Sequence, residues 1–344
     1  MNGSLGRRAI LGAGLPAAAL PSRALAQQKP IRIGVLTDMA GPNAANTGLG
    51  SVTGAQLAIE AFAASHPAIK MELVQADLQL KPDVALAIAA GWYHNESVGL
   101  VTDVPLSSAA FAIGDLAKNK DKSAIFTGGA SADITGSKCG PNHLHWCYDT
   151  WSMPHGVVDA TVKEGGGDTV NCIKQAAEFG IMQGDQKVAG LIMLIGDVHG
   201  MGRHAAQGVL LTEPCYWNMN DTTRAFAGRF AQRRPGTMPN SIHAGQYSAV
   251  MHYLKAVTAV GADKAKASGR AVIDQMKAMP TDDPLFRKGM VRADGRKIHD
   301  MHLFEVKTPA QSKQALDYYS HKRVIPAAEA FRPIALGNCP LVKA

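Results

Sequence analysis

The chain has 344 residues, of which 46% are hydrophobic and 18% are charged, so it is long enough for one large or two medium domains and too apolar to stay disordered. Its formal net charge is +7, but Lys and Arg are scattered, without a basic stripe or interleaved aromatic side chains, which disfavours nucleic acid as a partner.

The first 26 residues have the order of an export signal. Two arginines at 7–8 precede the short apolar run AILGAGLPAAAL, and Ala-Leu-Ala at 24–26 forms an A-x-A cleavage site. The run is too short and too interrupted by Gly and Pro to span a bilayer. The paired arginines resemble a twin-arginine signal, although Gly6 stands where Ser or Thr is usual, so twin-arginine and general export both stay open. We therefore expect a signal peptide at 1–26, cleavage near Ala26 and a periplasmic mature protein.

Apolar runs and helical patterns alternate through the first half of the chain. They predict strands at 31–37, 69–75, 98–104, 123–128 and 143–149, and helices at 48–64, 81–94, 107–117 and 151–164. This alternation is typical of an α/β fold in which a doubly wound parallel sheet carries helices on both faces.

The pattern changes after residue 164. Three glycines at 165–167 join the helix at 151–164 to a predicted helix at 168–180, with no strand between them. The second half continues with predicted strands at 187–195 and 208–214, helices at 221–234, 243–261 and 264–278, and a β-hairpin at 289–307 that turns at Asp294-Gly295.

A glycine-rich string, GLGSVTG at 48–54, opens the first predicted helix. Three hypotheses explain it. The first is a dinucleotide-binding fingerprint in which Asp77 binds the ribose, and the second is a set of glycines that only turn the chain. The third is a helix N-terminus that offers backbone N–H groups to a small anion such as a carboxylate. The loop at 37–47 argues against the dinucleotide, because a pyrophosphate needs the helix to begin close to the strand end. The anion hypothesis is favoured.

The cysteines number five, so at least one cannot pair within the chain. Export permits disulfides. Cys139 and Cys339 lie in loop-like segments and are the predicted pair, whereas Cys147, Cys172 and Cys215 lie in strand or helix patterns and are expected to be small buried residues.

Signatures of common catalytic sites are absent from the sequence. It contains no Gly-Lys dipeptide and therefore no Walker A loop, it contains no G-x-S-x-G, and its 12 histidines show no metal-ligand spacing. We therefore expect no enzyme activity, no cofactor and no metal. The alternative is an exported NAD(P)-dependent oxidoreductase, since the twin-arginine route can carry folded cofactor proteins.

Six stretches of the chain resemble the same protein family. They read IRIGVLTDMAGPNAANTGLGSVTGAQLAIEAF, KPDVALAIAAGWY, ASADITG, HLHWCYDTW, QGVLLTEPCYWNMNDTTRAF and AGQYSAVMHYLKAV. Together they resemble branched-chain amino acid ABC transporter substrate-binding proteins, the Leu/Ile/Val-binding type of periplasmic binding protein. The resemblance implies two α/β lobes, each with a doubly wound parallel sheet, that close on a small-molecule ligand. It also implies membrane permease subunits of an ABC importer as partners.

The resemblance places three crossovers between the lobes, near 148–151, 214–218 and 287–295. Lobe 1 would then comprise 29–149 and 217–290, and lobe 2 would comprise 150–216 and 291–344.

The family holds its ligand with the loops after the third and fourth strands. The matching residues here are Leu106, Ser107, Ser108, Gly129, Ala130 and Ser131. Ser107 and Ser131 are expected to donate hydroxyl hydrogen bonds to the ligand, to cap helices, or both. Tyr148, near the first crossover, is expected to line the cleft. Asp197 aligns with the family's lobe 2 acid, so it is expected either to pair with a ligand ammonium or to cap a helix.

The sequence departs from the family pattern at the glycines 165–167. Family members usually have strand–helix units there, one of which carries a ligand-contacting Tyr. Their absence predicts an internal deletion and a truncated lobe 2, whose sheet edge would be exposed unless it pairs again. The expected ligand is a branched-chain amino acid or a related carboxylate, amide or aromatic acid, and a binding-defective remnant of the family is a further alternative.

Overall fold

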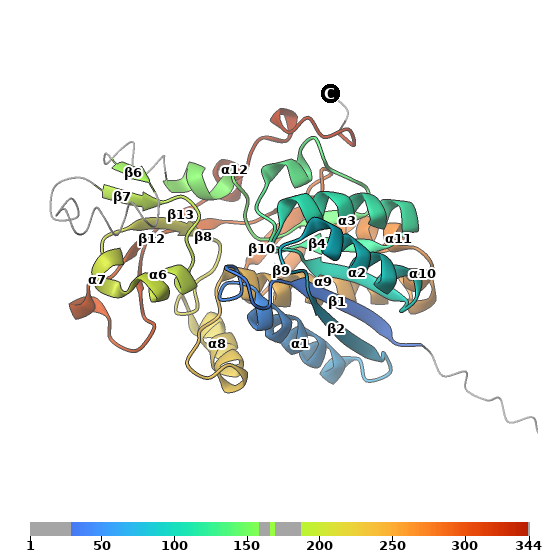
Figure 1. Ribbon diagram of the computed structural model, residues 1–344, viewed down its shortest axis with the longest axis horizontal. Coiled ribbons are helices and arrows are strands. Elements are labelled where there is room, and N and C mark those ends of the chain that lie inside the picture. Colours follow the sequence, from blue (N-terminus) through green and yellow to red (C-terminus); the bar gives the residue numbers. More distant parts are fainter. Residues whose placement is uncertain (1–28, 158–165, 169–186, 343–344) are drawn as a thin grey trace, which may run out of the picture.

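The computed structural model describes residues 29–157, 166–168 and 187–342. The predicted signal peptide, almost all of the helix expected at 168–180 and Cys172 lie outside these residues. Two five-stranded sheets occupy opposite halves of the molecule in Figure 1, which confirms the predicted α/β class. Within the described ranges, no helix has the length and apolar character needed to cross a membrane.

The first sheet has the strand order β2-β1-β3-β4-β5, and all of its strands are parallel. The strands are β1 Ile31–Thr37, β2 Met71–Asp77, β3 Val98–Asp103, β4 Ser123–Phe126 and β5 His143–His145. The inner strands β1, β3 and β4 are buried along almost their whole length, as expected for parallel strands that are covered on both faces. The strands predicted in the first half of the chain are therefore confirmed.

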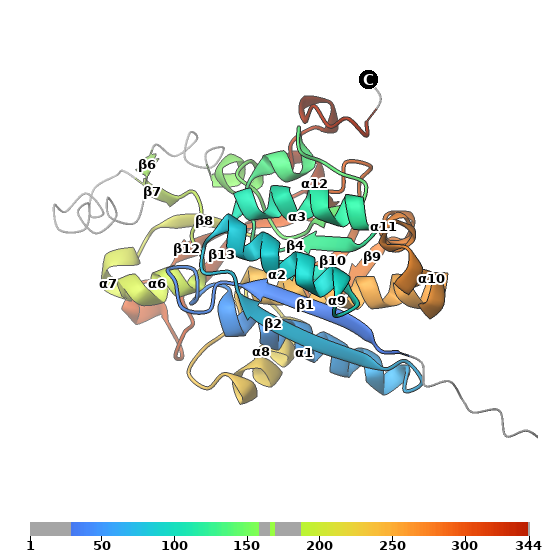
Figure 2. The ribbon, with the colours of Figure 1, turned by 45° about the vertical axis from the view of Figure 1, so that its right-hand side comes forward.

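Helices cover both faces of this sheet. They are α1 Gly48–Ser65, α2 Pro82–His94, α3 Ser107–Lys120, α9 Ser241–Val260, α10 Ala262–Ala267 and α11 Gly269–Ala278. Figures 1 and 2 both show α2 and α3 on one side of β1 and α1 on the other. The prediction of a single helix at 264–278 is wrong, because the structure has two helices there, α10 and α11. Ser268 ends α10 and caps α11, with its hydroxyl accepting a hydrogen bond from the Ala271 N–H at 3.2 Å.

The second sheet has the strand order β13-β12-β8-β7-β6. The strands are β6 Gly166–Asp168, β7 Lys187–Gly190, β8 Leu210–Glu213, β12 Met301–Val306 and β13 Tyr319–Ile325. The first three run parallel, whereas β12 runs antiparallel to both β8 and β13. The short helices α6 Ile195–Met201 and α7 Arg203–Ala206 lie between β7 and β8 in the chain.

Two expectations about this half are wrong. The glycines at 165–167 do not simply join two helices, because Gly166–Asp168 forms β6 and pairs with β7. Ladder hydrogen bonds use backbone groups alone, which glycine supplies as other residues do. The strand expected at 187–195 ends at Gly190, and its apolar continuation leads into α6. An apolar run does not by itself distinguish a buried strand from the buried start of a helix.

The chain passes between the two halves three times. It leaves the first sheet after β5, returns after β8 to α8 (Asp221–Arg233) and α9, and leaves again through a small sheet of β9 Thr281–Asp283, β10 Arg287–Val291 and β11 Lys297–Ile298. The predicted hairpin turn is confirmed between β10 and β11, where Gly295 has a φ of +88°. The hairpin does not extend to 307, because β12 joins the second sheet instead.

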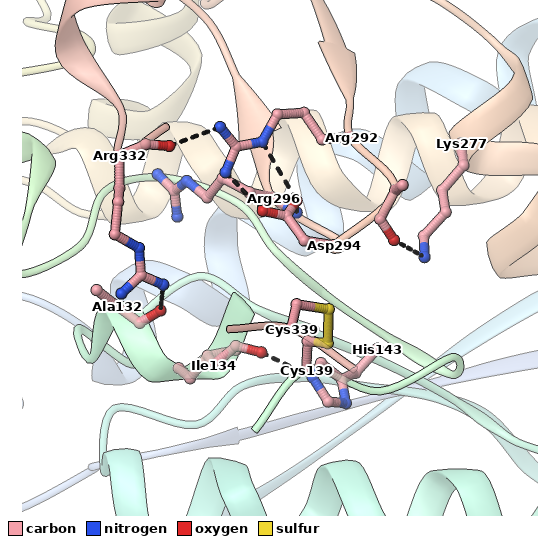
Figure 3. The surroundings of a disulfide bond; sticks show 11 residues. Ala132, Ile134, Cys139, His143, Lys277, Arg292, Asp294, Arg296, Arg332 and Cys339 are labelled. Carbon is pink, nitrogen blue, oxygen red and sulfur yellow. Dashed lines mark hydrogen bonds and ion pairs between the residues drawn. A yellow bond between two sulfur atoms is a disulfide. The ribbon is translucent and has the colours of Figure 1, made fainter. Parts of the chain in front are cut away.

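The C-terminal tail returns from the second half to the first. It follows β13 and α12 (Ala327–Ala330), and Cys339 is bonded to Cys139 with the Cα atoms 5.6 Å apart, as predicted. Figure 3 shows the tail's Arg332 nearby, with its Nη2 donating to the Ala132 carbonyl at 2.9 Å and its own carbonyl accepting from Arg292 Nη1 at 2.8 Å. The other described cysteines are buried and free, as expected: Cys147 and Cys215.

Candidate functional site

The carboxyl ends of the parallel strands from the two sheets meet between the halves of the molecule. Asn46, in the loop after β1, donates from Nδ2 to Oδ1 of Asp197, which follows β7, at 2.9 Å. Parallel α/β sheets bind ligands at this edge. All of the predicted site residues follow strands of the two sheets, so the topology brings them to this one region.

The loops after β3 and β4 are joined by a side chain. Ser107 is the first residue of α3, and its Oγ accepts from the Ser131 N–H at 3.2 Å. Ser131 Oγ in turn accepts from the Asp133 N–H at 3.2 Å and so caps a short 3-10 helix at Ala132–Thr135. Ser131 therefore caps a helix, as expected, whereas Ser107 does not cap α3, whose N-cap residue is Leu106, and instead joins the two loops. A hydrogen bond from either serine to a ligand stays a prediction. Leu106 precedes α3 in extended conformation, and Ser108 is exposed on its first turn.

The loop after β4 is also fixed to the first crossover. The Gly129 carbonyl lies 2.6 Å from His145 Nε2, and the Ala130 carbonyl accepts from the Thr150 N–H at 2.8 Å. Burial lowers the pKa of His145 to about 3, and the nearby Arg296 guanidinium acts in the same direction, so the ring is neutral at physiological pH and can donate to the carbonyl. These two contacts hold the loop against the first crossover.

Tyr148 lies where the two halves meet. Its side chain is buried, which raises its pKa well above the ordinary value, and the neighbouring groups Cys147, Asp103, Glu213 and Asp197 raise it further. Asp103 ends β3 of the first sheet, Glu213 ends β8 of the second, and Asp197 lies on α6. The Tyr148 hydroxyl is thus neutral, and carboxyl groups of both halves are near enough to act on it.

Asp197 has both carboxylate oxygens bonded to protein donors. Oδ2 accepts from the Leu194 N–H at 2.8 Å and caps α6, and Oδ1 accepts from Asn46. Burial raises its pKa from the ordinary value, against the opposing effect of these two donors. The expectation of a helix cap is met, while the pairing of Asp197 with a ligand ammonium stays a prediction.

Sequence reasoning did not find several buried polar groups at this edge. The buried atoms without a well-formed hydrogen bond in the described ranges include Asp103 Oδ2, Glu213 Oε1, Ser241 Oγ and Tyr319 Oη. Their residues are all at least 97% buried. Ser241 and Tyr319 lie close to Glu213, because both lower its pKa as hydrogen-bonding neighbours. Buried polar atoms without a well-formed hydrogen bond are uncommon inside a protein, and they often mark a place where water or a ligand binds. Asp103 also has a left-handed φ of +80°, a strain that is often found at functional sites.

Glu213 is a strongly perturbed acid at this edge. Burial raises the pKa of its carboxyl from 4.5 to about 8, and Asp197 contributes to the rise, although Ser241 and Tyr319 oppose it. The carboxyl is the last side chain of β8 before the second crossover. No sequence motif pointed to it, because its neighbours come from positions far along the chain.

A small pocket also opens between the two halves, with a volume of about 160 Å³. Its lining from the first half includes Ala44, Gly50, Asn240 and His243, and from the second half it includes Ile195, Gly196 and His199. Residues of both halves therefore line one pocket close to the Asn46–Asp197 bond.

The glycine string serves helix packing. A Cβ atom on Gly50 or Gly54 would collide with His243 of α9, so these glycines let α1 and α9 approach closely. Asp77 Oδ1 accepts from the Met39 and Gln79 N–H groups at 3.2 and 2.8 Å. Because the glycines pack against α9 and residues 38–47 separate β1 from α1, the geometry argues against a dinucleotide site. Across the described ranges, no group of three His, Cys, Asp or Glu is arranged to hold a metal ion.

Comparison with known proteins identifies the family. The sequence profile of periplasmic binding proteins matches residues 30–170 and 164–314. The chain belongs to the periplasmic binding protein family. The two matched segments overlap at 164–170, so the profile is interrupted at the glycines where this periplasmic binding protein forms β6.

Solved structures of other periplasmic binding proteins share the fold. A branched chain amino acid ABC transporter periplasmic ligand-binding protein from Burkholderia xenovorans is 32% identical, with a TM-score of 0.84 over 91% of this chain and 100% of that one. A periplasmic binding protein from Burkholderia mallei is 31% identical, with a TM-score of 0.83 over 91% and 99% of the two chains.

A more distant structure shows likeness of fold alone. It is a solute binding protein of an ABC transporter from Rhodopseudomonas palustris in complex with 3,4-dihydroxy benzoic acid, 17% identical, with a TM-score of 0.69 over 87% and 98% of the two chains. No curated protein sequence is a match for this chain.

Proposed function

We propose that this protein is the solute-binding component of an ABC importer, which binds a branched-chain amino acid or a related carboxylate, amide or aromatic acid and delivers it to membrane permease subunits. One observation carries the proposal: the carboxyl edges of two sheets from different halves meet at the Asn46–Asp197 bond, beside a pocket that is lined from both halves. Similarity along nearly the whole of the Burkholderia xenovorans transporter protein supports it.

We infer that the ligand is held between the predicted lobe 1 (29–149 and 217–290) and lobe 2 (150–216 and 291–344), although the tail of the latter segment lies against lobe 1 at Ala132 and Cys139. Leu106 to Ser108 and Gly129 to Ser131 supply backbone amides and hydroxyls for a ligand carboxylate. The 14-residue helix α3 supports this role, because its first turn directs free N–H groups and a partial positive charge toward the loop.

The periplasmic location rests on the family and on the export signal at 1–26. N-terminal sequencing of the protein from a periplasmic fraction is expected to begin at Gln27, whereas a chain that still begins at Met1 would contradict cleavage near Ala26.

A binding-defective remnant of the family is the second candidate. The interruption of the family profile at 164–170 favours it, because a shortened lobe 2 would lack contacts that other members have. The five strands of the second sheet support a lobe that still folds.

A thermal-shift screen separates the two candidates. Branched-chain amino acids, amides and aromatic acids would be added to the mature protein, and each ligand that raises the melting temperature would be titrated by calorimetry. Binding at micromolar affinity supports the importer component. The absence of any shift in all three classes, from a protein that melts cooperatively, would favour the remnant.

A further inference from the structure

The C-terminal tail, residues 326–342, joins the second sheet to the first half of the molecule. It follows β13 and forms α12, and Figure 1 shows it in red, running from α12 to the marked C-terminus. Near its end Cys339 is bonded to Cys139, and both cysteines are buried. The tail therefore connects the halves in addition to the three crossovers.

The middle of the tail is packed against the third crossover. Phe331 is only 3% exposed, with the Arg296 guanidinium 4.5 Å from its ring centroid and the His299 ring edge-on at 5.2 Å. A cation over an aromatic ring is attracted to it, so this packing is favourable. The Ala327 N–H also donates to Oδ1 of Asp300 at 3.1 Å. These contacts fix the tail to the chain between β10 and β12.

The end of the tail is packed against the 3-10 helix at Ala132–Thr135. Arg332 Nη2 donates to the Ala132 carbonyl at 2.9 Å, and Figure 3 shows the Arg332 side chain directed toward that carbonyl. Gly136 follows the helix and meets Gly337 closely, because a Cβ atom on Gly136 would lie 2.9 Å from the Gly337 carbonyl oxygen. The positions of the helix and of the tail therefore depend on each other.

Arg332 is also held from the third crossover. Its carbonyl accepts from Nη1 of Arg292 at 2.8 Å, and Arg292 Nη2 lies 2.6 Å from Oδ2 of Asp294. Asp294 is 1% exposed and belongs to the turn between β10 and β11. Figure 3 shows these residues as one series of contacts that leads from the turn to Ala132. Arg332 thus joins the third crossover to the 3-10 helix.

The 3-10 helix directly follows the loop Gly129–Ser131, which we call the β4 loop and which is among the predicted ligand contacts. Ser131 is the N-cap of this helix, so a shift of the helix moves the loop. On its other side the β4 loop is bonded to the first crossover, where the Thr150 N–H donates to the Ala130 carbonyl at 2.8 Å. The β4 loop is therefore held between the first crossover and the tail.

The disulfide keeps the end of the tail in place. A chain terminus frays unless it is tied down. The tail has little secondary structure of its own beyond α12 and a 3-10 helix at Ile334–Leu336, and Leu336 is 59% exposed. The bond between Cys139 and Cys339, with the Cα atoms 5.6 Å apart, confines this segment to the surface on which Arg332 makes its contacts.

We propose that the C-terminal tail is a strap that holds the β4 loop in its ligand-binding position, with Arg332, Cys139 and Cys339 as positioning residues. The role of the loop rests on the proposed function, but the position of the loop can be measured without a ligand. A loop that is already in place loses less entropy on binding, so the strap increases affinity. Because the tail continues from β13, the strap also links the second sheet to this loop.

Hydrogen–deuterium exchange of the ligand-free protein tests the proposal. In the wild type, the N–H groups of Ser131, Ala132 and Asp133 donate hydrogen bonds at 3.2, 3.1 and 3.2 Å, so their exchange is slowed. One variant replaces both disulfide cysteines by serine, and the other is Arg332→Gln, which removes the bond to the Ala132 carbonyl. In each variant the amides at 131–136 should exchange about 10-fold faster, because exchange reports the equilibrium for local opening.

Two controls separate a loosened loop from a general loss of stability. Helix α2, which packs against β1, β3 and α3, should exchange at the wild-type rate in both variants. Glu329→Gln changes an exposed residue on α12 of the same tail and should leave the exchange at 131–136 unchanged.

Ligand binding gives a second readout, with L-leucine and benzoate as the probes in calorimetry. A probe that binds the wild type should bind both strap variants about 10-fold more weakly, because a loop that is not preformed loses more entropy on binding. Glu329→Gln should bind the probe as the wild type does.

The outcomes distinguish the strap from the proposed function. Wild-type exchange at 131–136 in both strap variants, or equally faster exchange in α2, would overturn the strap and leave the importer function intact. Unchanged affinity in variants whose β4 loop exchanges faster would overturn the role of the strap in binding. Faster exchange confined to the loop, together with no binding of any compound in the thermal-shift screen, would support the strap and overturn the proposed function.

Discussion

The buried carboxyl of Glu213 should make the stability of the ligand-free protein fall as the pH rises. In the folded chain its pKa is about 8, whereas the ordinary value is 4.5, so between these values the folded state holds a proton that the unfolded state has lost. Each pH unit within this window then destabilises the fold by about 1.4 kcal/mol. The accumulated loss is about 3 kcal/mol at pH 7 and about 5 kcal/mol above pH 8.

Other buried groups titrate nearby, so a matched variant is needed. Burial lowers the pKa of His302, which is paired with Glu213 across β12 and β8, to about 4, and a depressed histidine loses stability as the pH falls below 6.5. Asp103 and Asp197 have raised pKa values and act in the same direction as Glu213. Glu213→Gln keeps the shape of the side chain and removes only its titration.

Urea unfolding of both proteins at pH 5, 6, 7 and 8 isolates the contribution of Glu213. The difference in unfolding free energy, variant minus wild type, should grow by about 1 kcal/mol or more per pH unit over this range. Parallel profiles for the two proteins would show that the carboxyl is solvated in solution, and the closed arrangement around it would then be refuted.

Three further predictions concern the packing and the connections between the halves. Gly54→Ala should cost about 1–3 kcal/mol of stability, because the added Cβ collides with α9; Gly228→Ala, on α8 with open space around it, is the control and should be neutral or stabilising in thermal unfolding. Replacing Cys139 and Cys339 by serine should lower stability by up to about 5 kcal/mol, since the bond closes a separation of 200 residues; an unchanged urea midpoint after reduction of the wild type would contradict this. Asn46→Ala removes the bond to Asp197 and should enlarge the radius of gyration of the ligand-free protein in solution scattering, and equal radii would show that this bond does not hold the halves together.

Most of the first sheet could be predicted because its signals are local. A run such as Ile31–Thr37 is apolar on both faces, and α2 begins at Pro82, a residue that favours the first turn of a helix. The second sheet was harder to predict from the sequence, because β6 consists of Gly166–Asp168 and pairs with a strand that begins about 20 residues later. Nothing in a glycine pair indicates a strand, since pairing depends on which backbone lies alongside.

The candidate site also has one part that could be predicted from the sequence and one part that could not. Its loops after β3 and β4 were predictable, because strand order alone puts those loops at the ligand-binding edge of the sheet. The grouping of Glu213, Ser241 and Tyr319 could not be predicted, because nothing in the sequence distinguishes these residues from others of their type. Folding brings them together from positions that span more than 100 residues of the chain. Burial raises the pKa of Glu213, and this burial depends on how the two halves pack together.

The pKa of Glu213 depends on groups from both halves. Ser241 belongs to the half that holds the first sheet, whereas Tyr319 belongs to the other, and both residues act on the carboxyl. The pH dependence of stability therefore reports on the packing between the halves. If the halves separate in solution, water reaches the carboxyl, its pKa falls back toward 4.5, and the difference in stability between Glu213→Gln and the wild type no longer grows with pH.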